Sequence, residues 1–266
     1  MLTVLITNYK TIDFLKLSLY GLEKLTKNSY KVLINDNGSS EDEINELKNL
    51  EQKYDYIKVN FRKTDSIPSY AHGEALDILI PIVDTKYFVV LDSDCTFLLK
   101  DWDEVLISDI TDDIKIIGTP YYTSSTSHKK GDFPAQFAVL FETETYRNLD
   151  ISCMPENLKE KDTCWEWREK YLSNGMESHI FSQINTRYEK DKNFIESLCI
   201  AYYYKNRLIA SHYGRGSSGG SSKKLRKSYY KIPIIGDFLK KRKAILEKNI
   251  WFEEVKNIIN NQLQGV

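Results

Sequence analysis

The chain contains 266 residues, 41% of them hydrophobic and 12% aromatic, with a formal net charge of −1. This composition excludes a disordered chain and indicates one large folded core. No segment has the roughly 20 consecutive apolar residues of a membrane span, and the amino-terminal run lacks a basic flank and a cleavage site. The four cysteines are widely separated and form no CxxC pair, which favours reduced thiols. We therefore expect a cytoplasmic protein that is neither exported nor membrane-spanning.

Strand and helix patterns alternate through the first third of the chain. Apolar runs predict strands at Leu2–Thr7, Tyr30–Asn35, Tyr56–Phe61 and Lys86–Leu91. Between them, apolar residues at helical spacing predict helices at 11–26, 40–54 and 70–83. Such alternation implies right-handed crossovers and a mostly parallel sheet flanked by helices, so the predicted fold class is α/β.

The second half of the chain is less regular. Strands are predicted at Ile114–Thr119 and Gln136–Phe141, and helices at Trp165–Leu172 and Glu177–Asn185. Two later apolar runs, Leu198–Tyr204 and Leu208–His212, are predicted to return to the edge of the sheet. Asp101 is the expected cap of a further short helix.

Polar side chains stand where the predicted strands end. Thr7 and Asn8 end the first strand, Asp36 ends the second and Asp92 ends the fourth. Ligands of open α/β sheets bind outside the carboxyl ends of the strands, so these residues should face one crevice. Asp92 and Asp94 are two residues apart and can share one hard cation beside a diphosphate. A turn explains the segment after Asp36 equally well, and a solvated loop or helix cap is the alternative for the aspartate pair.

Three of these segments, TVLITNYKT, INDNGSS and LDSD, together with FAVLFETETYRNL, resemble family 2 glycosyltransferases. The resemblance covers about the first 150 residues and becomes loose afterwards. It implies the Rossmann-like GT-A fold and an enzyme that moves a sugar from a nucleotide-diphosphate donor to an acceptor hydroxyl. The implied donor is linked to uridine or deoxythymidine diphosphate. The implied acceptor is a saccharide or a lipid-linked molecule in the synthesis of a polysaccharide or glycolipid.

The resemblance also assigns side chains to the nucleotide. Thr7, Asn8 and Tyr9 match the segment that lines the nucleobase, and Asp36 matches the acid at the base or ribose. His72 falls at the basic position near the diphosphate, and Asp92 and Ser93 belong to the DXD motif. An ordinary surface position is the alternative for His72. The Gly-rich stretch that begins at Gly214 could fold over the donor. Arg215 would then reach a phosphate, unless it is an exposed linker cation.

The implied metal ligands are Asp92, Asp94 and His212, with Asp94 the most direct. Two carboxylates and an imidazole suit Mn²⁺ or Mg²⁺, and the imidazole favours Mn²⁺. A structural role is the alternative for His212. A cation on the diphosphate would stabilise the departing charge, so the leaving group needs no protein acid.

A single inverting displacement needs a base, and the family places a carboxylate after the DXD motif. The candidates are Asp150, Asp162, Glu166 and Glu177. Asp162 is the first choice and Glu166 the second, because Thr163 and Glu166 have the spacing of a capping box.

Two features could contact the acceptor. The polar loop 121–132 is a candidate lid. Trp165 and Trp167 could stack on a sugar, although we expect one of them to lie in the core.

Two other classes of protein are alternatives to a glycosyltransferase. A metal-dependent nucleotidyltransferase would carry a Gly-rich basic loop after the first strand, which TNYKTIDF lacks. A non-catalytic nucleotide-sugar-binding or scaffold protein of the same fold would be marked by degraded acids, whereas Asp92 and Asp94 are intact.

The carboxyl-terminal part has a different charge from the body. Residues 221–250 contain ten Lys or Arg and two acids. The predicted organisation is a GT-A catalytic domain at 1–213, a flexible Gly/Ser loop at 214–224 and a basic amphipathic helical segment at 225–266. Residues 223–243 suit an anionic membrane surface, which would place the protein at the inner face of the membrane. A helix packed on the domain is the alternative; nucleic acid fits poorly because the body is acidic.

Overall fold

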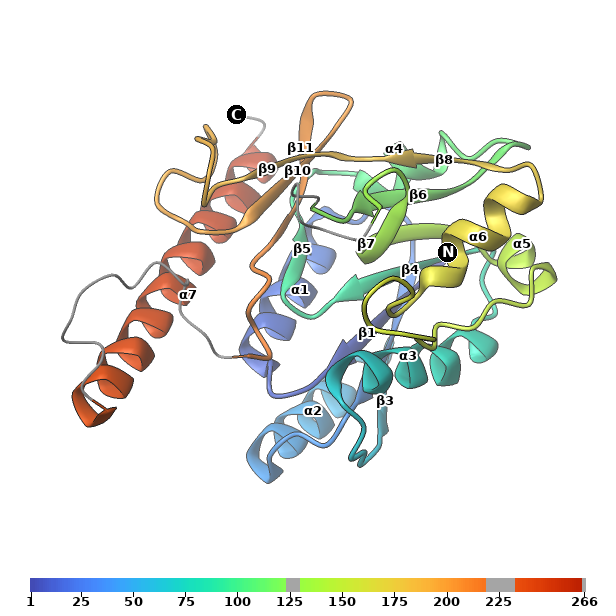
Figure 1. The fold of residues 1–266 in the computed structure, drawn as a ribbon. Helices are drawn as coiled ribbons and strands as arrows, with labels where there is room; N and C mark the ends of the chain where they lie inside the picture. The colour runs from blue at the N-terminus through green and yellow to red at the C-terminus, as the bar shows by residue number, and fades with distance from the viewer. Residues whose placement is uncertain (123–129, 219–232, 265–266) are drawn as a thin grey trace.

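The computed structural model describes residues 1–122, 130–218 and 233–264, and only the backbone at 233–237. A seven-stranded sheet lies at its centre, in the order β3-β2-β1-β4-β7-β6-β8 (Figure 1). Its strands are β1 (Leu2–Asn8), β2 (Tyr30–Asp36), β3 (Ile57–Phe61), β4 (Tyr87–Asp92), β6 (Ile114–Pro120), β7 (Pro134–Glu142) and β8 (Glu177–Ile180). Strands β1 to β4 are parallel, and β7 is antiparallel to β4 and β6. The predicted mostly parallel α/β sheet is confirmed.

Helices cover both faces of this sheet. They are α1 (Ile12–Leu25), α2 (Glu41–Lys53), α3 (Pro68–Leu79) with the 3₁₀ turn η1 (Ile80–Ile82), α4 (Trp102–Ile107), α5 (Thr143–Asn148), α6 (Trp165–Ser173) and α7 (Pro233–Gln264). Helices α1, α2, α4 and α7 contribute to one apolar core and α3, α5 and α6 to the other. Val4 and Ile6 of β1 enter the first core and Leu5 enters the second. A strand covered on both faces is mostly apolar, as β1 is.

A second sheet of four strands has the order β5-β11-β10-β9. Its strands are β5 (Cys95–Phe97), β9 (Ser182–Asn185), β10 (Ile200–Tyr204) and β11 (Arg207–His212). The two late apolar runs were predicted at the edge of the main sheet, and that prediction is wrong: they pair with each other and with β5 and β9. The short strand β5 has no counterpart in the sequence-based prediction.

The predicted helix at Glu177–Asn185 is also wrong. This segment forms β8 and β9, separated only by Phe181, which is buried. Strand β8 pairs with β6 of the main sheet and β9 pairs with β10 of the second sheet. Pairing with strands distant in sequence therefore determines the conformation here, rather than local helix propensity.

The second half of α7 packs against α1. Trp251, Val255 and Ile259 of α7 are fully buried in the first core, one helical turn apart. A helix is thus present in the predicted 225–266 segment, although the domain limits themselves stay a prediction. Most of the predicted lid (123–129) and most of the Gly/Ser loop and basic run (219–232) lie outside the described residues. Within the described segments, no helix combines the length and apolar character needed to cross a bilayer.

Candidate active site

Side chains from the carboxyl ends of β1 and β4 surround a cavity of about 370 Å³. The residues that line it include Thr7, Asn8, Tyr9, Asn37, His72, Asp92, Ser93 and Asp94. The parallel register places Thr7 beside Asp92, so β1 and β4 end at the same point on the edge of the sheet. Asn37 was not singled out from the sequence; its place directly after a strand end was the available signal.

Asp92, Asp94 and His212 form a compact triad, of which the two aspartates line this cavity. One ligand atom from each residue lies within 4.8 Å of the others. The His212 Nε2 atom is 3.1 Å from Asp94 Oδ1 and 3.7 Å from Asp92 Oδ2. Strand pairing creates this proximity, because Asp94 precedes β5 and His212 lies opposite Cys95 at the end of β11. Two carboxylate oxygens and one imidazole nitrogen form a donor set that fits Mn²⁺ or Mg²⁺.

The three groups strongly affect one another's charge. Burial raises the pKa of Asp92 to about 7, an effect that His212 opposes and Asp94 reinforces. Burial also acts to raise the pKa of Asp94, but His212 and two backbone amides hold it below its usual range. Burial acts to lower the pKa of His212, yet the carboxylates of Asp94 and Asp92 raise it. A divalent cation would relieve the repulsion between the two carboxylates.

The turn after β11 is hydrogen-bonded to the Asp94 side chain. The backbone N–H groups of Arg215 and Gly216 donate to Asp94 Oδ2 at 3.0 and 2.7 Å. The Arg215 side chain does not enter the cavity; its guanidinium donates to the Leu198 carbonyl at 2.9 Å and pairs with Glu247 at 3.3 Å. In this structure Arg215 therefore contacts the site through its backbone.

His72 lines the cavity, and its side chain is only 20% exposed. Its Nδ1 atom is 3.4 Å from Thr7 Oγ1 and its Nε2 atom is 3.8 Å from Asp92 Oδ1. Burial lowers the pKa of His72 to about 4, although the negative charge of Asp162 opposes this effect. The imidazole is therefore neutral at neutral pH and can donate one hydrogen bond.

The Asp36 carboxylate organises the loop after β2. It is 1% exposed and accepts hydrogen bonds from Asn8 Nδ2 at 2.8 Å and from the backbone of Gly38 and Ser39 at 3.1 and 2.9 Å. Gly38 has φ = 90°, a conformation that favours glycine. The geometry is that of the turn considered above; contact of Asp36 with a nucleotide stays a prediction.

Comparisons with known proteins agree with this architecture. The sequence model described as glycosyl transferase family 2 matches residues 3–157, more than half of the chain. The chain belongs to this family. No curated protein sequence matches it.

Two solved structures share the GT-A fold of this family 2 glycosyltransferase. One is the mannosyltransferase PcManGT from Pyrobaculum calidifontis in complex with GDP-Man and Mn²⁺: 9% identity, TM-score 0.53, covering 67% of this chain and 54% of that one. The other is GalNAc-T7 with UDP, GalNAc and Mn²⁺: 13% identity, TM-score 0.52, covering 67% of this chain and 41% of that one. The present chain thus spans about half the length of these proteins or less, and the likeness concerns the fold.

Of the four base candidates in this family 2 glycosyltransferase, Asp162 lies beside a second cavity, of about 340 Å³. Asp150 and Glu177 are exposed. The predicted capping box is wrong, because Cys164 precedes α6 with φ = 64° and no side chain caps the helix. Glu166 instead accepts a hydrogen bond from the Ser152 backbone at 3.0 Å.

The two tryptophans of α6 have different surroundings. Trp167 is fully buried and donates to the Tyr146 hydroxyl at 3.1 Å. Trp165 is half-buried and lines the second cavity, with Lys161 Nζ 4.2 Å from its ring centroid. One of the pair belongs to the core, as expected, and the other borders the second cavity.

Proposed function

We propose that the protein transfers a sugar, with inversion, from a nucleotide-diphosphate donor to a hydroxyl of a saccharide or lipid-linked acceptor. The donor is linked to uridine or deoxythymidine diphosphate, and the reaction contributes to the synthesis of a polysaccharide or glycolipid. The observation that carries this proposal is the Asp92–Asp94–His212 triad at the wall of a cavity where parallel strands end.

The first cavity would hold the donor. Thr7, Asn8 and Tyr9 offer polar and aromatic contacts to a nucleobase, and Tyr9 is 41% exposed. Neutral His72 can donate a hydrogen bond to a phosphate or ribose oxygen. The metal ligands would hold Mn²⁺ or Mg²⁺, which when bound supplies positive charge to the diphosphate as it leaves.

The second cavity would hold the acceptor. Asp162 lies beside it, and the charge of the same carboxylate acts on His72 in the first cavity. Both observations support Asp162 as the base, which would take the proton of an acceptor hydroxyl. The half-exposed face of Trp165 suits the apolar face of a sugar ring.

A thermal-shift experiment with nucleotide diphosphates tests the donor site. A ligand that binds only the folded protein raises its Tm, so we expect UDP or dTDP with Mn²⁺ to raise it more than either component alone. Product NMR with the matching nucleotide sugar would then show an inverted anomeric centre. Binding without turnover would favour a non-catalytic protein of the same fold, and release of diphosphate from a nucleoside triphosphate would favour a nucleotidyltransferase.

A further inference from the structure

The outward face of the first half of α7 combines apolar and basic side chains. Phe238, Ile245 and Leu246 are 64%, 57% and 59% exposed. At 3.6 residues per turn, Phe238, Arg242 and Ile245 share one face of the helix. Between residues 238 and 248 the helix has five Lys or Arg and a single acid, Glu247. Figure 1 shows these early turns extending past the end of α1.

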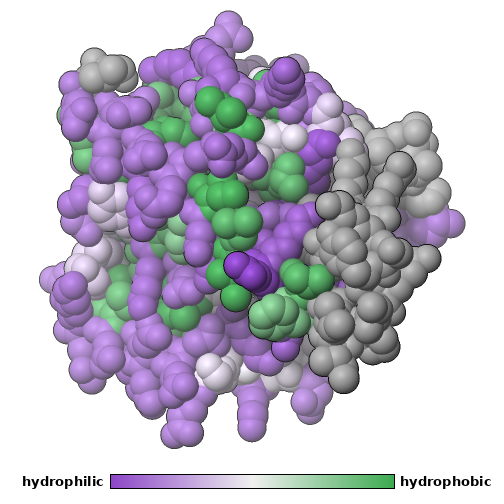
Figure 2. Space-filling view, turned by 90° about the vertical axis from the view of Figure 1, so that its left-hand side faces the viewer, coloured by the Kyte–Doolittle hydropathy of each residue, from purple (hydrophilic) through white to green (hydrophobic). Residues whose placement is uncertain are grey.

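The second half of α7 provides an internal comparison. There the inward face is buried through Trp251 and Ile259, and the outward positions include Lys256, Asn257 and Asn260. Apart from Leu263, which is 43% exposed near the end of α7, the exposed large apolar side chains of the helix therefore lie where it leaves the body. Figure 2 shows apolar groups exposed among hydrophilic ones on this side of the molecule. Packing within the described residues does not account for that concentration.

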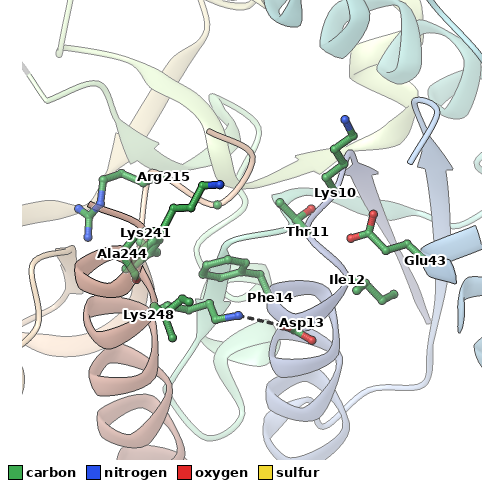
Figure 3. Close-up of a pocket in the computed structure, with 13 residues that line it drawn as sticks. Lys10, Thr11, Ile12, Asp13, Phe14, Glu43, Arg215, Lys241, Ala244 and Lys248 are labelled. Carbon is green, nitrogen blue, oxygen red and sulfur yellow. Dashed lines mark hydrogen bonds and ion pairs between the residues drawn. The ribbon is translucent and has the colours of Figure 1, made fainter. Parts of the chain in front are cut away.

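A hollow of about 330 Å³ lies between α7 and the start of α1 (Figure 3). Phe14, Ala244 and Ile245 form apolar parts of its lining, and Lys10 and Lys241 stand on opposite sides. Neither lysine forms an ion pair with another described residue. The lining also includes two acids, Asp13, which pairs with Lys248, and Glu43, against four basic residues in all. Apolar side chains beside this excess of cations complement a molecule that has a hydrocarbon part and an anionic head.

We propose that this hollow and the outward face of α7 together dock the protein on a bilayer of anionic phospholipid. Ile245 belongs to both surfaces, so a lipid headgroup at Lys10 and Lys241 would lie beside the part of α7 that enters the headgroup layer. The cations would contact lipid phosphates, and Phe238, Ile245 and Leu246 would enter the interface. The acidic body would be repelled from the same surface, which orients the molecule. This docking does not depend on the transfer chemistry.

Vesicle flotation of the full chain tests the docking surface. We expect binding to vesicles of phosphatidylcholine with phosphatidylglycerol, little binding to phosphatidylcholine alone, and weaker binding as salt is added. The Lys241→Glu/Arg242→Glu variant should bind more than about tenfold more weakly, since each cation near the surface contributes roughly fivefold. Lys256→Glu, on the polar half of the same helix, is the matched control and should keep wild-type binding. Equal losses in both variants, or equal binding to both vesicles, would overturn the proposal.

The hollow and the apolar face have separate tests. Lys10→Glu should weaken vesicle binding about fivefold, because it removes a cation from the far side of the hollow; unchanged binding would refute a headgroup there. Brominated acyl chains should quench the added fluorescence of Ile245→Trp and spare that of Asn257→Trp. Quenching of neither, or binding to heparin without binding to vesicles, would show a polyanion site in place of a lipid surface. These readouts measure lipid binding, so their failure would leave the donor site intact.

Discussion

The backbone amide of Gly216 donates to Oδ2 of Asp94 at 2.7 Å, and a Cβ at position 216 would lie only 2.8 Å from the Asp94 Cβ. Gly216→Ala must therefore displace either the turn or the Asp94 side chain. We expect at least about tenfold weaker Mn²⁺ binding, measured by calorimetry, because groups that orient a ligand contribute on this scale. Gly175→Ala is the control: it strains a backbone with φ = 72°, but the space around Gly175 is open. Unchanged Mn²⁺ affinity in Gly216→Ala would contradict a positioning role.

Asp94→Asn removes the carboxylate nearest to His212. We expect loss of Mn²⁺ binding and of sugar transfer by more than about 100-fold, with a folded protein by circular dichroism. Asp101→Asn is a suitable control, because the Asp101 side chain caps no helix and asparagine tolerates its φ of 57°. Transfer that persists in Asp94→Asn would remove this residue from the metal site.

Asp162 and Glu166 can be separated by conservative substitutions. Asp162→Asn should lower kcat by about 10²- to 10⁴-fold with little change in the Kd for the donor, as expected for a general base. Glu166→Gln keeps an oxygen that can accept from the Ser152 backbone, so its kcat should stay near wild type. Rates from steady-state transfer and Kd values from calorimetry decide the assignment. If Asp162→Asn weakened donor binding alone, Asp162 would be a positioning residue for the donor.

The Asp109 carboxylate gives a pH-dependent contribution to stability. It accepts from Lys205 Nζ at 2.7 Å and from the Tyr204 hydroxyl; although burial opposes them, these partners hold the pKa of Asp109 below its usual range. The contribution is therefore present above the ordinary pKa of Asp and is lost as the pH falls through the lowered native value. We expect Asp109→Asn to reduce the free energy of unfolding by about 1 kcal/mol at neutral pH, since Lys205 is partly solvated.

Urea unfolding at about pH 7 and about pH 3 measures this difference, which should shrink at the lower pH. The exposed Asp55, which pairs with no described cation, supplies the control variant Asp55→Asn and should show no difference at either pH. A penalty for Asp109→Asn that stayed constant with pH would indicate lost packing.

Local sequence signals were sufficient for strands β1 to β4 and for the helices between them. Strands β1 and β4 are largely apolar runs that are buried on both faces, so their composition matches their environment in the fold. The prediction of a helix at 177–185 was wrong because this segment pairs with β6 and β10, which lie elsewhere in the sequence. Strand β5 was missed because three residues are too few to show a period.

The features of the site likewise divide into those that could be predicted from the sequence and those that could not. The aspartate pair and His212 could be named because side-chain identity carries their chemistry. The hydrogen bonds to the Asp94 carboxylate could not be predicted, because backbone N–H groups of residues 215 and 216 donate them and such donors have no signature in the sequence. Thr163 likewise donates to the Ser69 carbonyl at 2.8 Å, a partner that only the folded chain provides.

The pairing of β5 with β11 brings together ligands that are 118 residues apart along the chain. The segment matched by the family model ends at residue 157 and contains both aspartates, but not the histidine. The ribosome therefore adds Asp92 and Asp94 to the growing chain long before His212. Only after β11 has been synthesised and has paired with β5 does the growing polypeptide possess all three residues of the triad, so the proposed cation binding would belong to a late stage of biosynthesis.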